Sequence, residues 1–168
     1  MRKLPFLLFL IPLLLPALGR SAESCPWLDA PTADASLGTT TTGTVRLLDT
    51  NQVDPDRIGD AICEFANQQG QPVRELRIEV RTVADPAREF ISYTAHCSSK
   101  PSPVKAVGNE ALACALEAKS GQVAEQIIGR LRNRIFVVTV RANESWVSHF
   151  VLLAKAYSVA DQVSGAMY

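Results

Sequence analysis

Residues 74–81 alternate between apolar and charged side chains with a period of two. Leu76, Ile78 and Val80 are separated by charged residues, namely Glu75, Arg77, Glu79 and Arg81. Such alternation is typical of a strand that buries one face and exposes the other, as in an antiparallel sheet with one solvated side. The charges change sign along the row, so we interpret the exposed face as an ordinary solvated surface.

Other segments also have the composition of strands: residues 39–49, 61–66, 111–117, 122–128 and 134–141. The last two predict a hairpin whose turn includes Arg132 and Asn133. Residues 135–138 are apolar without interruption, which predicts a central strand covered on both sides. Together these patterns predict an antiparallel sheet of about five strands.

Two or three helices are expected. Asp29 is suited to cap a helix over residues 29–37 that ends at Gly38, and Asp85-Pro86 opens a second helix that runs to about Cys97. In the last segment, residues 144–167, apolar side chains recur at steps of four and three. This stripe, which should lie on the sheet, comprises Trp146, Phe150, Leu153, Tyr157, Ala160, Val163 and Met167. The predicted fold class is α+β: a sheet packed by a long C-terminal helix and one or two shorter helices.

The N-terminus has the pattern of a secretory signal peptide. Arg2 and Lys3 precede an apolar run over residues 5–18, and small residues follow, so cleavage is expected after Gly19 or after Ala22. The run is too short and too rich in proline for a retained membrane span. We therefore divide the chain into a signal peptide, residues 1–22, and a single domain, residues 23–168, that is periplasmic or extracellular. Lipidation of Cys25 is an alternative, but the residues before it lack the usual apolar position.

Cleavage after Gly19 leaves 15 basic against 17 acidic side chains, a net charge of −2, and cleavage after Ala22 gives −3. A nearly neutral chain argues against a general nucleic-acid binder, because such binding rests on neutralising phosphates.

The exported domain carries four cysteines, Cys25, Cys63, Cys97 and Cys114. An even number in an oxidising compartment favours disulfides, for which three connectivities exist. We favour Cys25–Cys63, which ties down the N-terminus, and Cys97–Cys114, which closes a Ser/Pro loop. Buried free thiols are the alternative. A zinc site is disfavoured because the cysteines lack close spacing.

One basic run stands out as a candidate ligand site. Arg130, Arg132 and Arg134 occupy every second position near the predicted hairpin turn, so in an extended chain they share one side and suit a small anionic ligand. The alternative is a charged hairpin tip that maintains solubility.

The sequence motifs do not predict a catalytic site, a metal site or a cofactor site. No nucleophile elbow or phosphate-binding loop is present, and no catalytic residue, metal ligand or cofactor is predicted. Asp54, Asp56 and Asp60 share one segment but lack the spacing of a calcium loop. His149 is the one plausible general base, although the adjacent Ser148 would point in a different direction on a helix.

Several short motifs resemble small exported bacterial proteins of unknown function of the LpqN-like lipoprotein kind, and more distantly the PsbP/Mog-like fold. They are the early cysteine before a Leu/Ala helix ending at Gly38, the Ile62-Cys63-Glu64-Phe65 strand, Val107-Gly108-Asn109-Glu110-Ala111, and a final amphipathic helix. The resemblance implies a curved antiparallel sheet between helices and a binding or assembly role. The chain departs from it at Asn109, where such proteins often have Asp.

The sequence therefore favours an exported, non-catalytic binding or interaction module for an unknown protein or a small anionic ligand. A hydrolase that uses His149 and a structural component of an envelope assembly are the alternatives.

Overall fold

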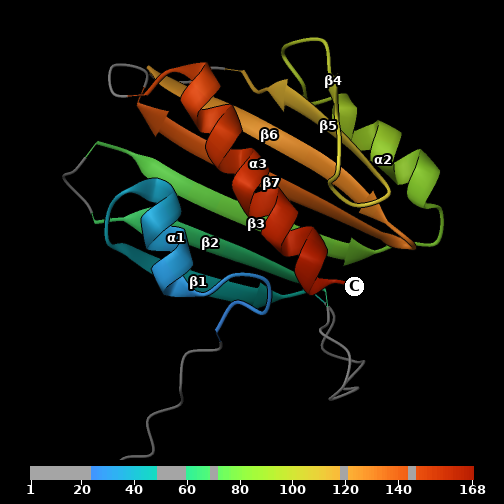
Figure 1. Ribbon diagram of the computed structural model, residues 1–168, viewed down its shortest axis with the longest axis horizontal. Coiled ribbons are helices and arrows are strands. Elements are labelled where there is room, and N and C mark those ends of the chain that lie inside the picture. The colour runs from blue at the N-terminus through green and yellow to red at the C-terminus, as the bar shows by residue number, and fades with distance from the viewer. Residues whose placement is uncertain (1–23, 49–59, 69–71, 118–120, 144–146) are drawn as a thin grey trace, which may run out of the picture.

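The computed structural model describes residues 24–48, 60–68, 72–117, 121–143 and 147–168. The predicted signal peptide, residues 1–22, lies outside this part of the chain. The described residues form one antiparallel sheet with three helices packed on it (Figure 1). The helices are α1 (Ala30–Leu37), α2 (Pro86–Thr94) and α3 (His149–Ala166). The strands are β1 (Thr41–Leu47), β2 (Ala61–Asn67), β3 (Arg74–Thr82), β4 (Ser102–Val104), β5 (Glu110–Ala115), β6 (Gln122–Leu131) and β7 (Arg134–Asn143).

The sheet confirms the α+β class but is larger than expected. It has seven strands in the order β1-β2-β3-β7-β6-β5-β4, against the prediction of about five. Every predicted extended segment joins it, and the Ser/Pro loop adds the short edge strand β4. Pro101 precedes this strand and Pro103 lies within it, which is typical of a loop, yet an edge strand tolerates proline.

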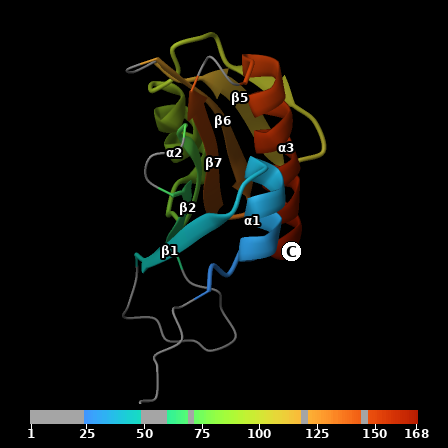
Figure 2. The ribbon, with the colours of Figure 1, turned by 90° about the vertical axis from the view of Figure 1, so that its left-hand side faces the viewer.

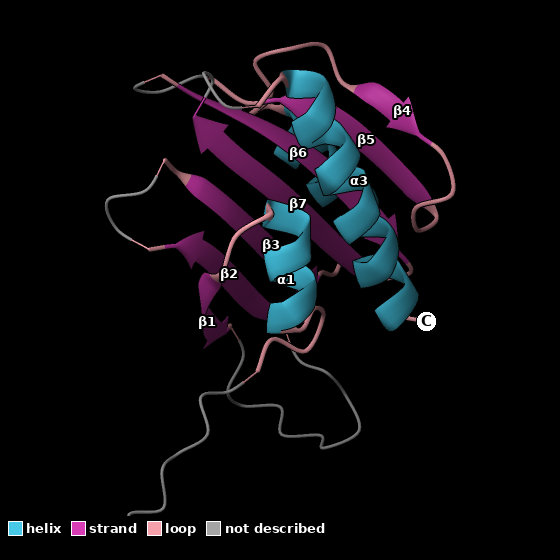
Figure 3. Cartoon of the chain, turned by 60° about the vertical axis from the view of Figure 1, so that its left-hand side comes forward, coloured by secondary structure: helices cyan, strands magenta, loops and turns pink. Residues whose placement is uncertain are grey.

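The helices cover the two faces of the sheet unequally. Figure 2 shows α1 and α3 on one face and α2 alone on the other, and Figure 3 shows α1 and α3 side by side. We call these the α3 face and the α2 face. The larger part of the apolar core lies on the α3 face, where the apolar side of β3 meets that of β7. A smaller cluster around Phe90 lies beneath α2.

The ends of the first two helices follow the sequence signals. The Asp29 carboxylate accepts the N–H of Thr32 at 2.8 Å, and Gly38 ends α1 in a left-handed conformation with φ 66°. Asp85 caps α2 through the N–H of Arg88. This helix ends at Thr94 rather than near Cys97, because Cys97 leaves the helix to bridge to Leu116 beside the sheet.

The predicted hairpin of β6 and β7 is confirmed. Leu131 faces Arg134, so Arg132 and Asn133 form the two-residue turn, and β7 is the central strand of the sheet. Gly129 faces Phe136, whose buried ring lies where a side chain at residue 129 would be. The glycine therefore makes room for the largest fully buried side chain of the core.

The predicted apolar stripe of the last helix is wrong in its first half. Phe150 is 80% exposed and Tyr157 is 41% exposed, whereas the face on the sheet carries Leu152, Ala156 and Val159, followed by Ala160, Val163 and Met167. Both rows have helical spacing. The observed row contains alanines, which let the helix approach the sheet closely, while the aromatic row lies outside. Trp146 and the predicted start at Glu144 lie outside the described residues, and the helix begins at His149 after Ser148.

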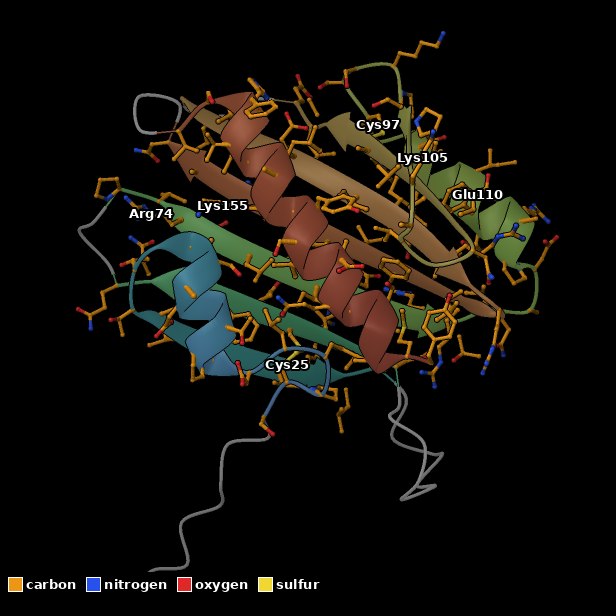
Figure 4. All side chains as sticks on the ribbon, viewed as in Figure 1. Cys25, Arg74, Cys97, Lys105, Glu110 and Lys155 are labelled. Carbon is orange, nitrogen blue, oxygen red and sulfur yellow. A yellow bond between two sulfur atoms is a disulfide. The ribbon has the colours of Figure 1, made fainter. Side chains whose placement is uncertain are left out.

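Both favoured disulfides are present. Cys25 is bonded to Cys63 and Cys97 to Cys114, with Cα–Cα distances of 5.7 Å in each case. The first joins the N-terminal segment to β2, and the second joins the segment that follows α2 to β5 (Figure 4, where Cys25 and Cys97 are labelled). No helix in the described ranges has the length and apolar character needed to cross a membrane.

Candidate functional site

The α2 face is only partly covered. Phe90 packs with Ile128, Ile135 and Val137 over one end of β6 and β7, together with Cys114 of β5. Beyond this cluster, β2, β3 and the other end of β7 present polar side chains. The strand pairing sets Glu64, Arg77 and Thr139 in one row across the sheet, and Ala66, Glu75 and Arg141 in the next.

A chain of ion pairs runs along this polar area. Arg77 donates to Glu64 on β2 and, at 2.8 Å, to Glu79 on its own strand. Glu79 accepts a second bond from Arg81 at 2.5 Å and one from the Tyr93 hydroxyl at 3.2 Å. This last contact joins α2 to the charged row, because Tyr93 belongs to the helix. The alternating charges of β3 are therefore a connected network rather than separately solvated groups.

Burial and neighbouring charges act in opposite directions on the pKa values of Glu79 and Arg77. Burial alone would raise the pKa of Glu79, whose side chain is 12% exposed, but hydrogen bonds and charges from Arg77 and Arg81 outweigh it and lower the pKa. Burial likewise disfavours the charge of Arg77, yet Glu79 and Glu64 raise its pKa. Burial and the charge of Glu79 raise the pKa of Tyr93 to about 12. Glu79 is thus a carboxylate held charged beneath α2.

A hollow of about 240 Å³ opens beside the network. Its walls are Glu64 and Arg77 on one side and Glu75 and Arg141 on the other, with Ala66 and Thr139 between them. Phe65 and Leu76, whose side chains belong to the core of the α3 face, complete the lining. The hollow exists because Ala66 and Thr139 are short where their neighbours on the sheet are long.

The hollow carries two opposed ion pairs. Arg141 donates to Glu75 at 3.0 Å across β3 and β7, and Arg77 pairs with Glu64 across β2 and β3. The four side chains are between 38% and 54% exposed, so solvent reaches both pairs. The site presents two guanidinium groups, two carboxylates and the Thr139 hydroxyl within one small opening.

The structure separates the three arginines predicted as an anion site. Leu131 faces Arg134 and Arg130 faces Ile135, so Arg134 lies on the α3 face and Arg130 on the α2 face. The prediction that they share one side is wrong, because the two-residue turn at Arg132 intervenes and reverses the chain.

Each arginine near the turn has its own surroundings. The guanidinium carbon of Arg134 lies 5.7 Å from the centre of the Trp27 ring, and Arg130 donates to Glu110 at 3.1 Å. Arg132, with φ 56°, donates its backbone N–H to the Asn109 side chain.

The Val107–Ala111 segment forms hydrogen bonds with residues at this turn. Asn109 donates its backbone N–H to the carbonyl of Arg130 and accepts from Arg132, while Glu110 pairs with the Arg130 side chain. A Cβ on Gly108 would lie 2.7 Å from the carbonyl oxygen of Arg130, so glycine permits the close approach. The Val107–Ala111 segment is therefore a structural clamp on the hairpin.

His149 is oriented by a carboxylate. His149 is the first residue of α3, and its Nδ1 lies 2.5 Å from Oε1 of Glu125 on β6. The Glu125 side chain is 7% exposed. Among the described residues, no hydroxyl or thiol forms a hydrogen bond with the His149 ring. The pair lies on the α3 face, whereas the hollow lies on the other face.

The sequence showed part of this site. The alternating charges of β3 were recognised, but the hollow also needs Glu64 from β2 and Arg141 from β7, which only the strand register brings together. The nearest sequence signal is a charged and a short residue two positions apart, at Glu64–Ala66 and again at Thr139–Arg141. This pattern is too common to identify a site. No protein-family model matches the chain, and no curated protein matches it.

Proposed function

We propose that the protein is an exported binding module, and that the hollow between β2, β3 and β7 binds a small zwitterionic ligand, one that carries both a cationic and an anionic group. The observation that carries this proposal is the pairing of two arginine–glutamate bridges around one opening of about 240 Å³. The volume suits a molecule of few heavy atoms.

The two bridges are suited to exchange partners. An exposed ion pair contributes only about 0–1 kcal/mol, so replacing one partner with a ligand group costs little. A ligand carboxylate or phosphate accepts a bidentate pair of hydrogen bonds from the planar guanidinium of Arg141 or Arg77. A ligand ammonium takes the carboxylate of Glu75 or Glu64. An ion of one sign alone would release a protein charge without compensating it, which is why we favour a zwitterion over the anion expected from the sequence.

The rest of the α2 face supports a fixed site. Glu79 is bonded to Arg77, Arg81 and Tyr93, so the guanidinium of Arg77 is held from below by a charged partner. A binding group that is already positioned loses less conformational entropy when the ligand arrives.

Export is the second part of the proposal. The secretory pattern of residues 1–22 and the two disulfides support an oxidising compartment, either the periplasm or the cell exterior. The resemblance to LpqN-like lipoproteins supports a binding role rather than an enzymatic one.

The test is a titration of the oxidised domain with the dipeptide glycylglycine. Binding is measured by calorimetry and by the changes in NMR chemical shift of the Thr139 and Ala66 amides. N-acetylated and C-amidated glycylglycine, each with one charge removed, serve as controls for the ligand. We expect the zwitterion to bind more tightly than either control, and binding to weaken with salt.

Matched variants locate the site. Arg141→Ala should weaken binding at least about tenfold, because a charge-assisted hydrogen bond contributes about 1.5–3 kcal/mol. Arg132→Ala, at an exposed arginine of the turn, should leave binding unchanged. The reverse result would favour a site at the arginines of the β6–β7 turn. Equal affinity for all three dipeptides would contradict a site for zwitterions.

A further inference from the structure

The two edges of the sheet differ in their protection. β4 is three residues long and contains Pro103, so it offers little to another strand. β1 is seven residues long, contains no proline and has a single charged side chain, Arg46. Most of its side chains are exposed. Long, uncharged edge strands are the ones that pair with other chains, and natural proteins usually protect them.

The pairing with β2 shows which backbone groups of β1 are open. Leu48 donates its N–H to the carbonyl of Asp60, and the register continues as Arg46 opposite Ile62 and Thr44 opposite Glu64. In an antiparallel pair, alternate residues exchange backbone hydrogen bonds. The even-numbered residues of β1 therefore bond to β2, and the odd-numbered ones direct their N–H and C=O groups outward.

One outward group is already used. The Asp34 carboxylate accepts the N–H of Thr41 at 2.8 Å and its hydroxyl at 2.7 Å. This contact supports the assignment of odd-numbered groups as outward. Among the described residues, no hydrogen bond reaches the outward groups of Gly43, Val45 or Leu47, so the open part of the edge is this run.

The side chains along this run fit the same run of a second copy of the chain. Leu47 is a large apolar residue that is 39% exposed. Gly43 has no side chain, and the ring of Phe65 lies 3.0 Å from where its Cβ would be. If two copies of β1 pair about a two-fold axis at Val45, each Leu47 lies opposite the Gly43 of the other copy.

We propose that β1 is a dimerisation edge, which pairs antiparallel with β1 of a second copy about Val45 and continues the sheet across both molecules. In this register the three open residues face one another: Val45 faces its counterpart, and Gly43 faces Leu47 twice. Each facing pair exchanges two backbone hydrogen bonds. Thr41, whose N–H Asp34 holds, lies outside the paired run, and Arg46 faces the uncharged Thr44, so no like charges meet.

The first test is sedimentation of the oxidised mature domain from about 1 μM to about 1 mM, a range that covers weak self-association. We expect a reversible monomer–dimer equilibrium. Leu47→Lys places a charge in the pairing edge and should raise the dimer dissociation constant at least about tenfold. Ile91→Lys, at a 68% exposed residue of α2, is the matched control and should leave the equilibrium unchanged.

The second test is amide hydrogen exchange followed by NMR at both ends of that range. The amides of Gly43, Val45 and Leu47 should become protected at high concentration, whereas those of Thr44 and Arg46, bonded to β2, should be protected throughout. A domain that stays monomeric overturns the proposal, as does a dimer that is indifferent to Leu47→Lys. Protection of the odd-numbered amides in the monomer would show that another segment of the same chain covers the edge, and would also overturn it.

Discussion

The Nζ atom of Lys155 lies 2.5 Å from the carbonyl oxygen of Ser36, so α3 donates a hydrogen bond to the last turn of α1. Arg74 reaches the same helix end from β3, with Nη1 3.0 Å from the carbonyl oxygen of Leu37 and 2.9 Å from that of Gly38. Arg74 and Lys155 are labelled in Figure 4. Two cations thus satisfy carbonyl groups that the end of a helix leaves free, and they oppose the negative end of its dipole.

Removal of the Lys155 ammonium should loosen α1. Lys155→Met keeps most of the side-chain length but leaves the Ser36 carbonyl without its charged donor. We expect the free energy of unfolding to fall by about 1–2 kcal/mol, measured by urea denaturation. Lys105→Met, at an exposed lysine, should change it by less than about 0.5 kcal/mol. Equal losses in the two variants would contradict a specific role for Lys155.

A methyl group at Gly129 should be costly. The added Cβ would lie 2.0 Å from Cζ of Phe136, whose ring is fully buried and has no free direction to move. Gly129→Ala should therefore destabilise the domain by about 2–3 kcal/mol. The control is Gly165→Ala near the end of α3, where an added Cβ would meet no atom within 4 Å apart from the adjoining helix backbone. Alanine favours the helix, so stability should rise by about 0.5–1 kcal/mol. Thermal unfolding of both variants would distinguish the two effects.

The Tyr93 phenol should make the domain sensitive to alkali. Burial and the charge of Glu79 raise the pKa of Tyr93 to about 12, above its ordinary value of 10.0. Since the folded pKa is the higher one, this contribution to stability is complete below pH 10 and is lost as the pH rises toward about 12. Tyr93→Phe should flatten that part of the stability profile. Ultraviolet titration near 295 nm of Glu79→Gln should show the Tyr93 phenol ionising at a lower pH than in the unaltered protein, and an unchanged titration would show that Glu79 has no part.

The two disulfides should differ in their contribution. Cys25–Cys63 spans 38 residues and Cys97–Cys114 spans 17. Because a longer closed loop restricts the unfolded chain more, replacing the first pair with serine should cost about 4 kcal/mol and the second about 3 kcal/mol. Urea unfolding of each double variant checks this order. A larger loss on removing the shorter bridge would show that contacts in the folded state, rather than chain entropy, dominate.

Much of the architecture was predictable because local chemistry determined it. Asp29 and Gly38 bound α1 as their types suggest, and the alternation of β3 identified its buried side. The disulfide pairing also followed, since each favoured bridge closes one compact part of the chain.

The orientation of α3 was not predictable from spacing. Two apolar rows have the same helical period, and the choice between them depends on how closely the helix approaches the sheet. That distance is set by Ala156 and Ala160 against β6 and β7, not by the hydrophobicity of Phe150 and Tyr157. A hydrophobic pattern alone ranks the larger side chains first, and it therefore predicts that the aromatic row faces the sheet.

The candidate site was not predictable for a different reason. Glu64, Arg77 and Arg141 come from three strands, and their grouping depends on register between segments distant in the sequence. The prediction that the arginines near the turn share one side was wrong for the opposite reason. They are close in sequence, but one reversal of the chain at Arg132 assigns Arg130 and Arg134 to opposite faces.

The order of the strands divides the molecule into two halves that the main chain joins but no disulfide does. β1 to β3 form one half and β4 to β7 the other, and each half contains its own disulfide, Cys25–Cys63 or Cys97–Cys114. The seam between them is the β3–β7 ladder, where Val73 donates to Asn143, 70 residues away. No disulfide crosses this seam, so each half can be oxidised before the seam closes. The slow step of folding is then expected to be the meeting of two halves that already hold their disulfides. Beyond the main chain that links them, the halves are held together by packing, by hydrogen bonds and by the Arg141–Glu75 ion pair across the seam.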